Sequence, residues 1–230
     1  MLTRVIALIV AALGLGGCGA SSQVEPGSLG AFAAYAWKGE VDSVHAVWRV
    51  PEIREGPCGI AGTWIGASAE GQAFLQIGTG EECVRPGRKS VGLPLDANYF
   101  TFWSDTSKAY HPHVFYAVSP GDLIEATLAL QRHRWRLTII DASTDLKASF
   151  TTDEETQRRP YWAEWAQEDV ELRTSYAPYP TLSEVKLSHV LVNGKPPSPE
   201  QLESSGLMVP NGTLQPSRLH DDSFEIQRSG

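Results

Sequence analysis

The chain has 230 residues, of which 42% are hydrophobic, and its formal net charge is −8. This length and composition fit one domain with a sizeable core. The acidic balance and the lack of a stripe of Lys and Arg exclude a typical nucleic-acid-binding protein, because such proteins need clustered cations.

The N-terminal residues predict export. Arg4 precedes the apolar run VIALIVAALGL, residues 5–15, which is too short to span a bilayer comfortably. The LGGC that ends at Cys18 resembles the lipobox of bacterial lipoproteins. This resemblance implies that residues 1–18 form a signal peptide with a lipidated Cys18, and that residues 19–30 form a tether. We therefore expect an exported protein, lipid-anchored to a bacterial membrane at the outer membrane or the cell surface. An ordinary secretory signal is the alternative.

The remaining residues, 31–230, are predicted to form one all-β domain. Short apolar runs between Gly, Pro and polar residues predict strands from Phe32 and at residues 41–50, 61–67, 73–78, 98–103, 113–118, 122–130, 133–141, 146–152, 161–169, 184–193 and 223–228. Alternation is clearest where Trp135, Leu137 and Ile139 are separated by Arg and Thr. Residues 198–206 predict a short helix. About a dozen strands in one domain indicate an antiparallel β-sandwich.

Two cysteines remain after Cys18, and these are Cys58 and Cys83. An exported chain with two such cysteines most simply contains one disulfide. Neither lies in a CxxC motif or in the Cys/His spacing of a metal site. We therefore expect a Cys58–Cys83 bond, which would tie down the segment between them, and no redox or zinc site.

Two segments place polar side chains beside aromatic ones. Alternation puts Gln76 on the same strand face as Phe74, and it puts Glu168 on the same face as Trp162 and Glu164. A carboxyl group among rings has its charged form desolvated, which raises its pKa toward a range useful for proton transfer. An amide nearby could donate a hydrogen bond to a developing oxyanion. Ordinary polar residues on a solvated face are the competing interpretation.

Six motifs in a fixed order add a resemblance to a known family. They are GTWIGA, FLQIG, an aromatic strand with a Trp, GDLIEATL, AEWAQED and EVKLSHVLVNGK. This ordered set resembles the eqolisins, which are acid glutamic peptidases. The resemblance covers nearly all of the chain beyond the tether. It implies a sandwich of two seven-stranded antiparallel sheets, in the manner of a concanavalin-like jelly roll, with the active site on the concave face of one sheet.

The resemblance also implies site residues. It assigns the catalytic dyad to Gln76 and Glu168, places Trp64 in the lining of the site, and makes Trp162 and Trp165 part of the setting of Glu168. In the mechanism that the family suggests, Glu168 acts as general base on a water and Gln76 stabilises the tetrahedral intermediate. The substrate would be a polypeptide, no metal or other cofactor would be needed, and we expect a monomer that is active at acid pH.

Some positions depart from the family pattern. Ser68 stands where typical members have an Asp, and Trp103 with Asp105 is the nearest equivalent of a Trp-x-Glu in the aromatic strand. We expect Ser68, Trp103 and Asp105 to bind substrate together with Trp64. We also expect Gln76 and Glu168 on neighbouring strands of one sheet, facing the same cleft.

Two functions remain open at this point. The retained Gln and Glu favour an endopeptidase. The altered positions favour a non-catalytic sandwich module that binds peptides or glycans on the same concave aromatic face.

Overall fold

The computed structural model describes residues 32–54, 59–68, 74–83, 99–108, 112–152, 160–172, 175–176, 179–209 and 212–229. The signal peptide with Cys18, the tether and Cys58 lie outside these residues. Within the described residues, no helix is both long and apolar enough to cross a membrane.

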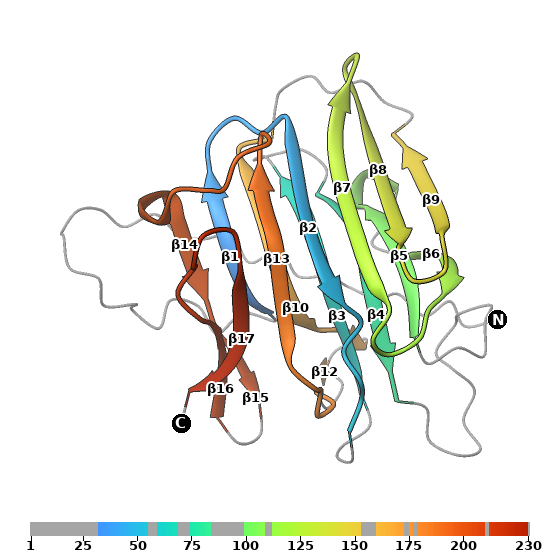
Figure 1. Ribbon diagram of the computed structural model, residues 1–230, viewed down its shortest axis with the longest axis vertical. Coiled ribbons are helices and arrows are strands. Elements are labelled where there is room, and N and C mark those ends of the chain that lie inside the picture. Colours follow the sequence, from blue (N-terminus) through green and yellow to red (C-terminus); the bar gives the residue numbers. More distant parts are fainter. Residues whose placement is uncertain are drawn as a thin grey trace.

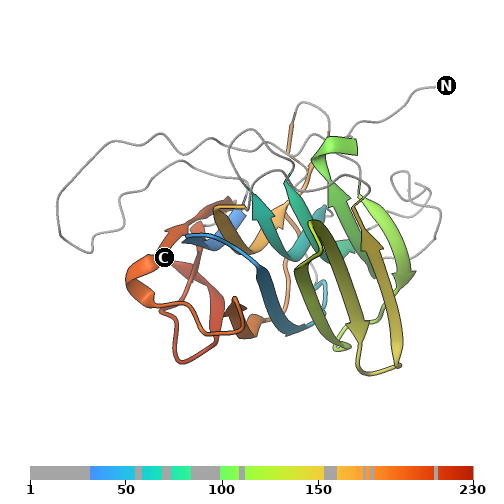
Figure 2. The ribbon, with the colours of Figure 1, turned by 90° about the horizontal axis from the view of Figure 1, so that it is seen from above.

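Two antiparallel sheets form a sandwich, which confirms the predicted all-β fold. The first sheet contains, in spatial order, β14 (Leu202–Ser205), β1 (Phe32–Lys38), β10 (Trp162–Asp169), β3 (Ile60–Ser68), β4 (Leu75–Glu82), β5 (Tyr99–Asp105) and β6 (His113–Ala117). The second sheet contains β15 (Leu207–Val209), β16 (Gly212–Pro216), β17 (Phe224–Ser229), β13 (Val185–Val192), β2 (Ser43–Arg49), β7 (Leu123–Gln131), β8 (Arg134–Asp141) and β9 (Leu146–Thr151). Figure 1 looks onto the second sheet with the first behind it, and Figure 2 shows the layers from above.

Short elements complete the described fold. β11 (Glu171–Leu172) pairs with β12 (Ser175–Tyr176), and two 3-10 helices span Thr106–Lys108 and Pro199–Gln201. The helix expected at residues 198–206 is therefore wrong beyond its first turn. Leu202–Ser205 instead forms β14, because its backbone pairs with β1 at the edge of the first sheet. In an isolated segment, the backbone N–H and C=O groups of these residues would be paired within a helix. Here they pair with the neighbouring strand β1.

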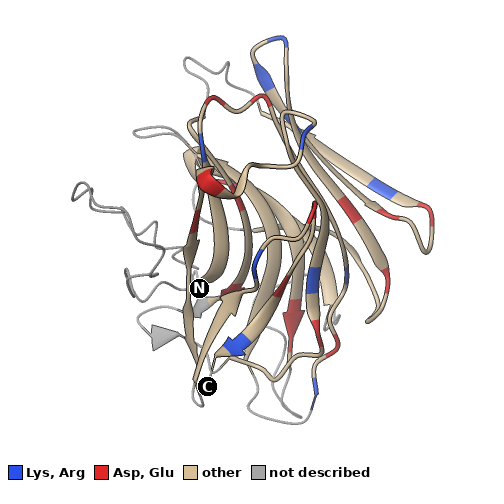
Figure 3. Cartoon of the chain, turned by 60° about the vertical axis from the view of Figure 1, so that its left-hand side comes forward, with Lys and Arg blue, Asp and Glu red and all other residues tan. Residues whose placement is uncertain are grey.

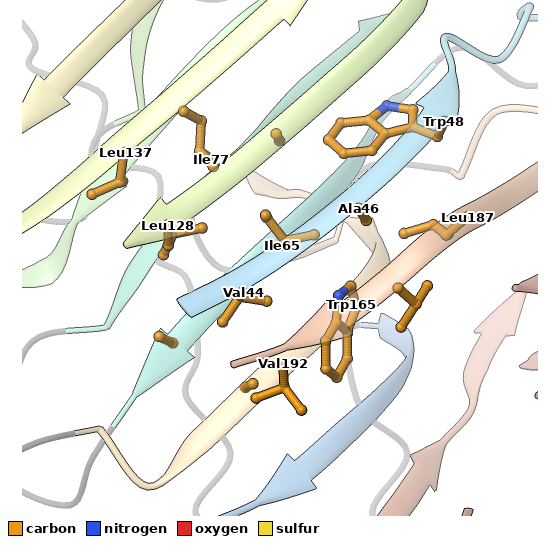
Figure 4. Close-up of a cluster of buried hydrophobic side chains, with 14 of the residues drawn as sticks. Val44, Ala46, Trp48, Ile65, Ile77, Leu128, Leu137, Trp165, Leu187 and Val192 are labelled. Carbon is orange, nitrogen blue, oxygen red and sulfur yellow. The ribbon is translucent and has the colours of Figure 1, made fainter. Parts of the chain in front are cut away.

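The core lies between the two sheets. Odd-numbered residues of β3 and β4, such as Ile65 and Ile77, point toward the second sheet, where Trp48 and Leu128 are also fully buried. Figure 4 shows these side chains together with Trp165 in the space between the layers. Since successive side chains of a strand alternate between faces, the even-numbered residues of β3 and β4 lie on the opposite face. That face is called the outer face below.

Among the described residues, Lys and Arg do not form a cluster. Lys and Arg lie on several separate elements in Figure 3, interspersed with Asp and Glu. One tight turn joins β7 to β8, and another follows β13, where Val192 forms an isolated bridge with Lys195. Arg132 and His133 have φ of 50° and 71°, and Asn193 and Gly194 have φ of 53° and 74°. Positive φ at both central residues is the geometry that joins twisted antiparallel strands.

Candidate active site

An aromatic cluster separate from the core covers the outer face of the first sheet. Its buried members are Ala34, Trp64, Phe74, Phe100, Phe102 and Ala166. The Trp64 ring lies at its centre, with edge contacts to Phe74 at 5.5 Å and to Phe32 at 5.9 Å between ring centroids. The polar residues predicted to be catalytic lie on this face.

Glu168 is the most strongly perturbed carboxyl group on the outer face. Its side chain is only 5% exposed, and Oε2 accepts a hydrogen bond of 2.8 Å from Nε1 of Trp64. Burial raises the pKa of Glu168 to about 8, against the lowering effect of the Trp64 bond, and the negative charges of Asp169 and Glu164 raise it further. At neutral pH a large part of Glu168 is therefore protonated, and the ionised fraction grows as the pH rises through about 8.

Gln76 is also buried on this face, with an exposed fraction of 1%. Neither Nε2 nor Oε1 of its amide has a hydrogen-bond partner. Leaving a buried polar group unpaired costs about 1–3 kcal/mol, so such a group usually has a reason to be retained. An amide with both atoms unused can donate to, or accept from, a ligand that reaches it.

Phe74 packs over the backbone next to Gln76. Its ring atoms lie 3.0 Å from the position that a Cβ on Gly66 would occupy, so glycine at that position leaves room for the ring. The ring also packs against Trp64. A ligand that approaches Gln76 from the side of β3 therefore meets Phe74.

Gln76 and Glu168 lie on the same face, as expected, but not on neighbouring strands. β3 lies between β4 and β10. Gln76 pairs with Gly66, and Gly66 pairs with Glu164 on its other side, whereas Glu168 pairs with Gly62. The two predicted catalytic residues are therefore offset by four positions, roughly 13 Å along the strands and two spacings of about 4.8 Å across them.

Trp64 occupies the intermediate position between the two. Its cross-strand partners are Ala166 on one side and Gly78 on the other. Residues that are cross-strand partners across the sheet are called a row below. The row that contains Trp64 lies between the row of Gln76 and the row of Glu168. Trp64, which is expected to line the site, lies on the same face as both residues.

Glu164, for which the sequence predicts no role, also lies on the outer face. It shares the row of Gln76, and Gly66 between them has no side chain. Burial raises the pKa of its carboxyl to about 7, against the lowering effect of the Ser68 hydroxyl, which donates a hydrogen bond of 3.4 Å to Oε1. Ser68, expected to bind substrate, lies on the outer face as this partner of Glu164. The alternation of side chains along the strand already placed Glu164 on the same face as Glu168, so the sequence did contain an indication that Glu164 belongs to the site.

Trp103 and Asp105 lie on the opposite side of the first sheet, which corrects the expectation that they join Trp64. The Trp103 ring stacks on Phe150 of β9 at 3.5 Å and on His113 at 4.2 Å. Asp105 accepts hydrogen bonds from the amide and hydroxyl of Ser107 at 2.9 and 2.7 Å. Neither side chain is brought to the outer face.

β5 contributes Phe102 and Ser104 to the outer face, in place of Trp103 and Asp105. Ser104 pairs with Gln76 and Phe102 pairs with Gly78. The segment YFTFWSD carries aromatic rings on both faces, so alternation alone does not distinguish them. Only the pairing with β4 shows that Phe102 and Ser104, rather than Trp103 and Asp105, lie beside Gln76.

Trp165 is also corrected, because it belongs to the core between the sheets. It is fully buried there, and its Nε1 donates a hydrogen bond of 3.0 Å to the carbonyl oxygen of His45. Trp162 does lie on the outer face, paired with Ser68. The surroundings of Glu168 on the outer face are thus formed by Trp64 and its ring neighbours.

A second group of buried polar residues lies between the sheets, on the other side of β3 and β4. Thr79 donates a hydrogen bond of 2.8 Å to Oε1 of Glu81 and accepts one of 3.1 Å from Nε1 of Trp48. Desolvation raises the pKa of Glu81 well above its usual range. Glu81 has no access to the outer face, so it belongs to the packing of the sandwich. Across the described residues, no group of three or more His, Cys, Asp and Glu side chains could hold a metal ion.

The disulfide prediction stays a prediction, because Cys58 lies outside the described residues. The backbone nevertheless brings its neighbour close to Cys83. The amide of Cys83 donates a hydrogen bond of 2.9 Å to the carbonyl oxygen of Gly59, continuing the pairing of β3 with β4.

Comparison with known families settles the relationship of the chain. Residues 28–207 match the family described as the Peptidase A4 family. The chain belongs to this family. The family is that of the eqolisins, so the match confirms the resemblance seen in the motifs.

Solved structures of Peptidase A4 family relatives share the fold. Scytalido-glutamic peptidase with a transition state analog inhibitor superposes with a TM-score of 0.68 at 18% identity, over 86% of this chain and 98% of that one. SCP-B, an eqolisin solved with the tripeptide Ala-Ile-His, gives 0.63 at 18% identity over 86% and 98%. Aspergilloglutamic peptidase from Aspergillus niger gives 0.57 at 18% identity over 74% and 99%. A search of curated protein sequences found no match.

Proposed function

We propose that this Peptidase A4 family member is a glutamic endopeptidase that hydrolyses peptide bonds with Glu168 and Gln76. The setting of Glu168 is the observation that carries the proposal. A carboxyl group buried among aromatic rings, bonded to an indole N–H, with a pKa near neutrality, is suited to general acid–base catalysis. The tripeptide bound to one eqolisin relative supports a polypeptide substrate.

The reaction begins with the ionised form of Glu168. This carboxylate accepts a proton from a water molecule as the water oxygen attacks the scissile carbonyl carbon. Nε2 of Gln76 donates a hydrogen bond to the oxygen that becomes negative in the tetrahedral intermediate. Glu168 then gives its proton to the leaving nitrogen as the C–N bond breaks, which yields a carboxylic acid and an amine. Both catalytic groups return to their starting states.

The offset between the two rows requires adjustment when substrate binds. Gln76 and Glu168 must both lean toward the row of Trp64 to reach one carbonyl group, and Phe74 must give way over Gly66. Catalytic hydrogen bonds are often long or misaligned without substrate and tighten only in the complex. Because the side-chain amide of Gln76 has no hydrogen-bond partner, such a movement breaks no hydrogen bond of that amide.

The ionisation of Glu168 sets the expected pH range. The base is the charged form, which burial disfavours by raising the pKa to about 8. The acid limb of kcat/KM should therefore lie well above the ordinary Glu value of ~4.3. This moves the active range from the acid pH expected from sequence toward neutrality.

Digestion of a denatured protein across a pH series tests the proposal. Glu168→Gln keeps the shape but removes the proton carrier, and we expect activity to fall by about 10²–10⁴-fold. Gln76→Ala removes the oxyanion donor and should cost about 10²–10³-fold. A wild-type protein that is inert at every pH, or a Glu168→Gln variant as active as wild type, would refute the peptidase.

A non-catalytic binding module is the second candidate. The offset rows and the position of Phe74 favour it, because no rearrangement is then needed. Its ligands would be peptides or glycans bound on the aromatic outer face. Ligand binding by an inert wild-type protein, abolished by Trp64→Ala, would support this function over hydrolysis.

We also propose that the protein is exported as a monomer and anchored through lipidated Cys18. The N-terminal motif described from the sequence carries this proposal. Metabolic labelling with a fatty acid, compared between wild type and Cys18→Ala, tests it. Label in the variant equal to that in wild type would contradict it.

A further inference from the structure

The outer face carries a marked imbalance of charge. Among its described strand residues, the acidic side chains are Glu82, Glu164, Glu168 and Glu203, and the only Lys or Arg is Lys38. Lys38 lies at the end of β1, where it pairs with Trp162, and Trp162 pairs with Ser68. Lys38 is thus one row of cross-strand partners beyond Gln76, on the side away from Glu168.

Two aromatic rings hold the Lys38 ammonium group. Nζ lies 5.1 Å from the centroid of the Trp162 ring and 5.9 Å from that of Tyr161. Contacts of this kind attract a cation electrostatically and partly desolvate it. Among the described residues, the ion pairs join other side chains, so no described carboxylate neutralises the charge of Lys38.

The position of this group relative to Gln76 defines a spacing. Trp162 lies on β10, two strands from β4, and two residues from the row of Gln76. These offsets amount to roughly 12 Å from Gln76. From the row of Trp64, toward which both catalytic side chains must lean, Trp162 is one strand and four residues away, roughly 14 Å. An extended peptide spans these distances with about three or four residues.

We propose that Lys38, Trp162 and Tyr161 form a substrate subsite for an acidic side chain, three or four residues from the scissile bond. The inference rests on the proposed peptidase function and deepens it. The ammonium group supplies an opposite charge, and the two rings contact the methylene groups of the bound Glu. Because Lys38 is the only Lys or Arg among the described strand residues of an acidic face, an ionised side chain has one favourable place to bind on those strands.

A peptide series tests the subsite. Fluorogenic peptides with one cleavage site carry Glu or Gln at each successive position, with amidated C-termini to exclude binding through a terminal carboxylate. One position should favour Glu by about two- to five-fold in kcat/KM, the range of a partly exposed ion pair. In a binding measurement, which needs no turnover, the preference should disappear below the ordinary Glu pKa of ~4.3, where the peptide side chain is neutral.

Lys38 variants assign the preference. Lys38→Gln should abolish the preference, so that the Glu and Gln peptides give equal kcat/KM, and Lys38→Glu should reverse it. Lys147→Gln is the matched control, because Lys147 is exposed on β9 of the second sheet. A preference that persists in Lys38→Gln, or no preference at any position, would overturn the subsite.

Binding separates failure of the subsite from failure of the peptidase. Fluorescence anisotropy with the Glu and Gln peptides and the Glu168→Gln variant needs no hydrolysis. Suppose that the wild-type protein cleaves none of the peptides, yet binds the Glu peptide more tightly than the Gln peptide and loses this difference in Lys38→Gln. The peptidase proposal then fails and the subsite stands. If the peptides are cleaved or bound without regard to charge, the subsite fails.

Discussion

Nε1 of Trp64 donates a hydrogen bond of 2.8 Å to Oε2 of Glu168 across the boundary between β3 and β10. The bond favours the ionised carboxylate and opposes the effect of burial on its pKa. One tryptophan thus fills the centre of the outer face and also moderates the ionisation of the proposed catalytic base.

Replacing the indole donor should change the pH profile. Trp64→Phe keeps an aromatic ring but removes the N–H, so the pKa of Glu168 should rise further. Since a hydrogen bond to a charged group contributes about 1.5–3 kcal/mol, we expect the acid limb of kcat/KM to move up by about one unit or more. A profile that drops in height without moving along the pH axis would show that Trp64 acts only through packing.

Glu164→Gln should move the same limb in the opposite direction. The negative charge of Glu164 raises the pKa of Glu168, and the variant removes that charge while keeping the hydrogen bond with Ser68 feasible. Activity should then begin at lower pH. The measurement is kcat/KM against pH, with Glu203→Gln at the edge strand β14 as control. Equal shifts in both variants would mean that net charge, rather than Glu164 itself, is responsible.

Stability should decrease as pH rises through neutrality. Burial raises the pKa of Glu168 to about 8 and those of Glu164 and Asp169 to about 7, and it raises that of Glu81 as well. A carboxyl group whose pKa is higher in the folded state binds its proton more tightly there. The stability that such a group contributes is fully present below its pKa in the unfolded state, ~4, and is lost as the pH rises through its pKa in the folded state, up to about 8.

Thermal unfolding at a series of pH values checks this. The melting temperature should be highest near pH ~4 and fall toward pH ~8. Glu81→Gln should flatten the slope, because it replaces one buried ionisable group by a neutral one of similar shape. A melting temperature that rises over this interval would contradict the raised pKa values.

Two glycines of the outer face should respond differently to substitution. A Cβ on Gly78 would lie 2.2 Å from the carbonyl oxygen of Thr63 and 2.5 Å from Cβ of Trp64, so backbone must shift. Gly78→Ala should lower the free energy of unfolding by about 1–3 kcal/mol or more. Gly62→Ala is the control, because its nearest contacts would be an ordinary 3.7 Å. Equal losses in urea unfolding would show that the close approach does not matter.

The predicted disulfide can be examined in the folded protein. Peptide mapping without reduction should recover a fragment that joins Cys58 to Cys83, and Cys83→Ser should lower stability by about 2–4 kcal/mol. The register at Gly59 and Cys83 supports this expectation. Recovery of both cysteines as free thiols from oxidising conditions would disprove it.

The sequence by itself determined the class of fold and the face of each catalytic candidate. Alternation is a local property, so it correctly placed Gln76 with Phe74 and Glu168 with Trp162 and Glu164. The ordered motifs identified the family. Gln76 and Glu168 were assigned as catalytic candidates from the short motifs that contain them, FLQIG and AEWAQED.

The tertiary structure decided which strands are neighbours and in what register. The insertion of β3 between β4 and β10 puts Trp64 between Gln76 and Glu168, and brings Glu164 into the row of Gln76. These relationships join residues far apart in the chain, so no local pattern encodes them. Residues 99–105 bury side chains on both faces, so periodicity could not tell Trp103 from Phe102, and only hydrogen bonding to β4 assigns their sides.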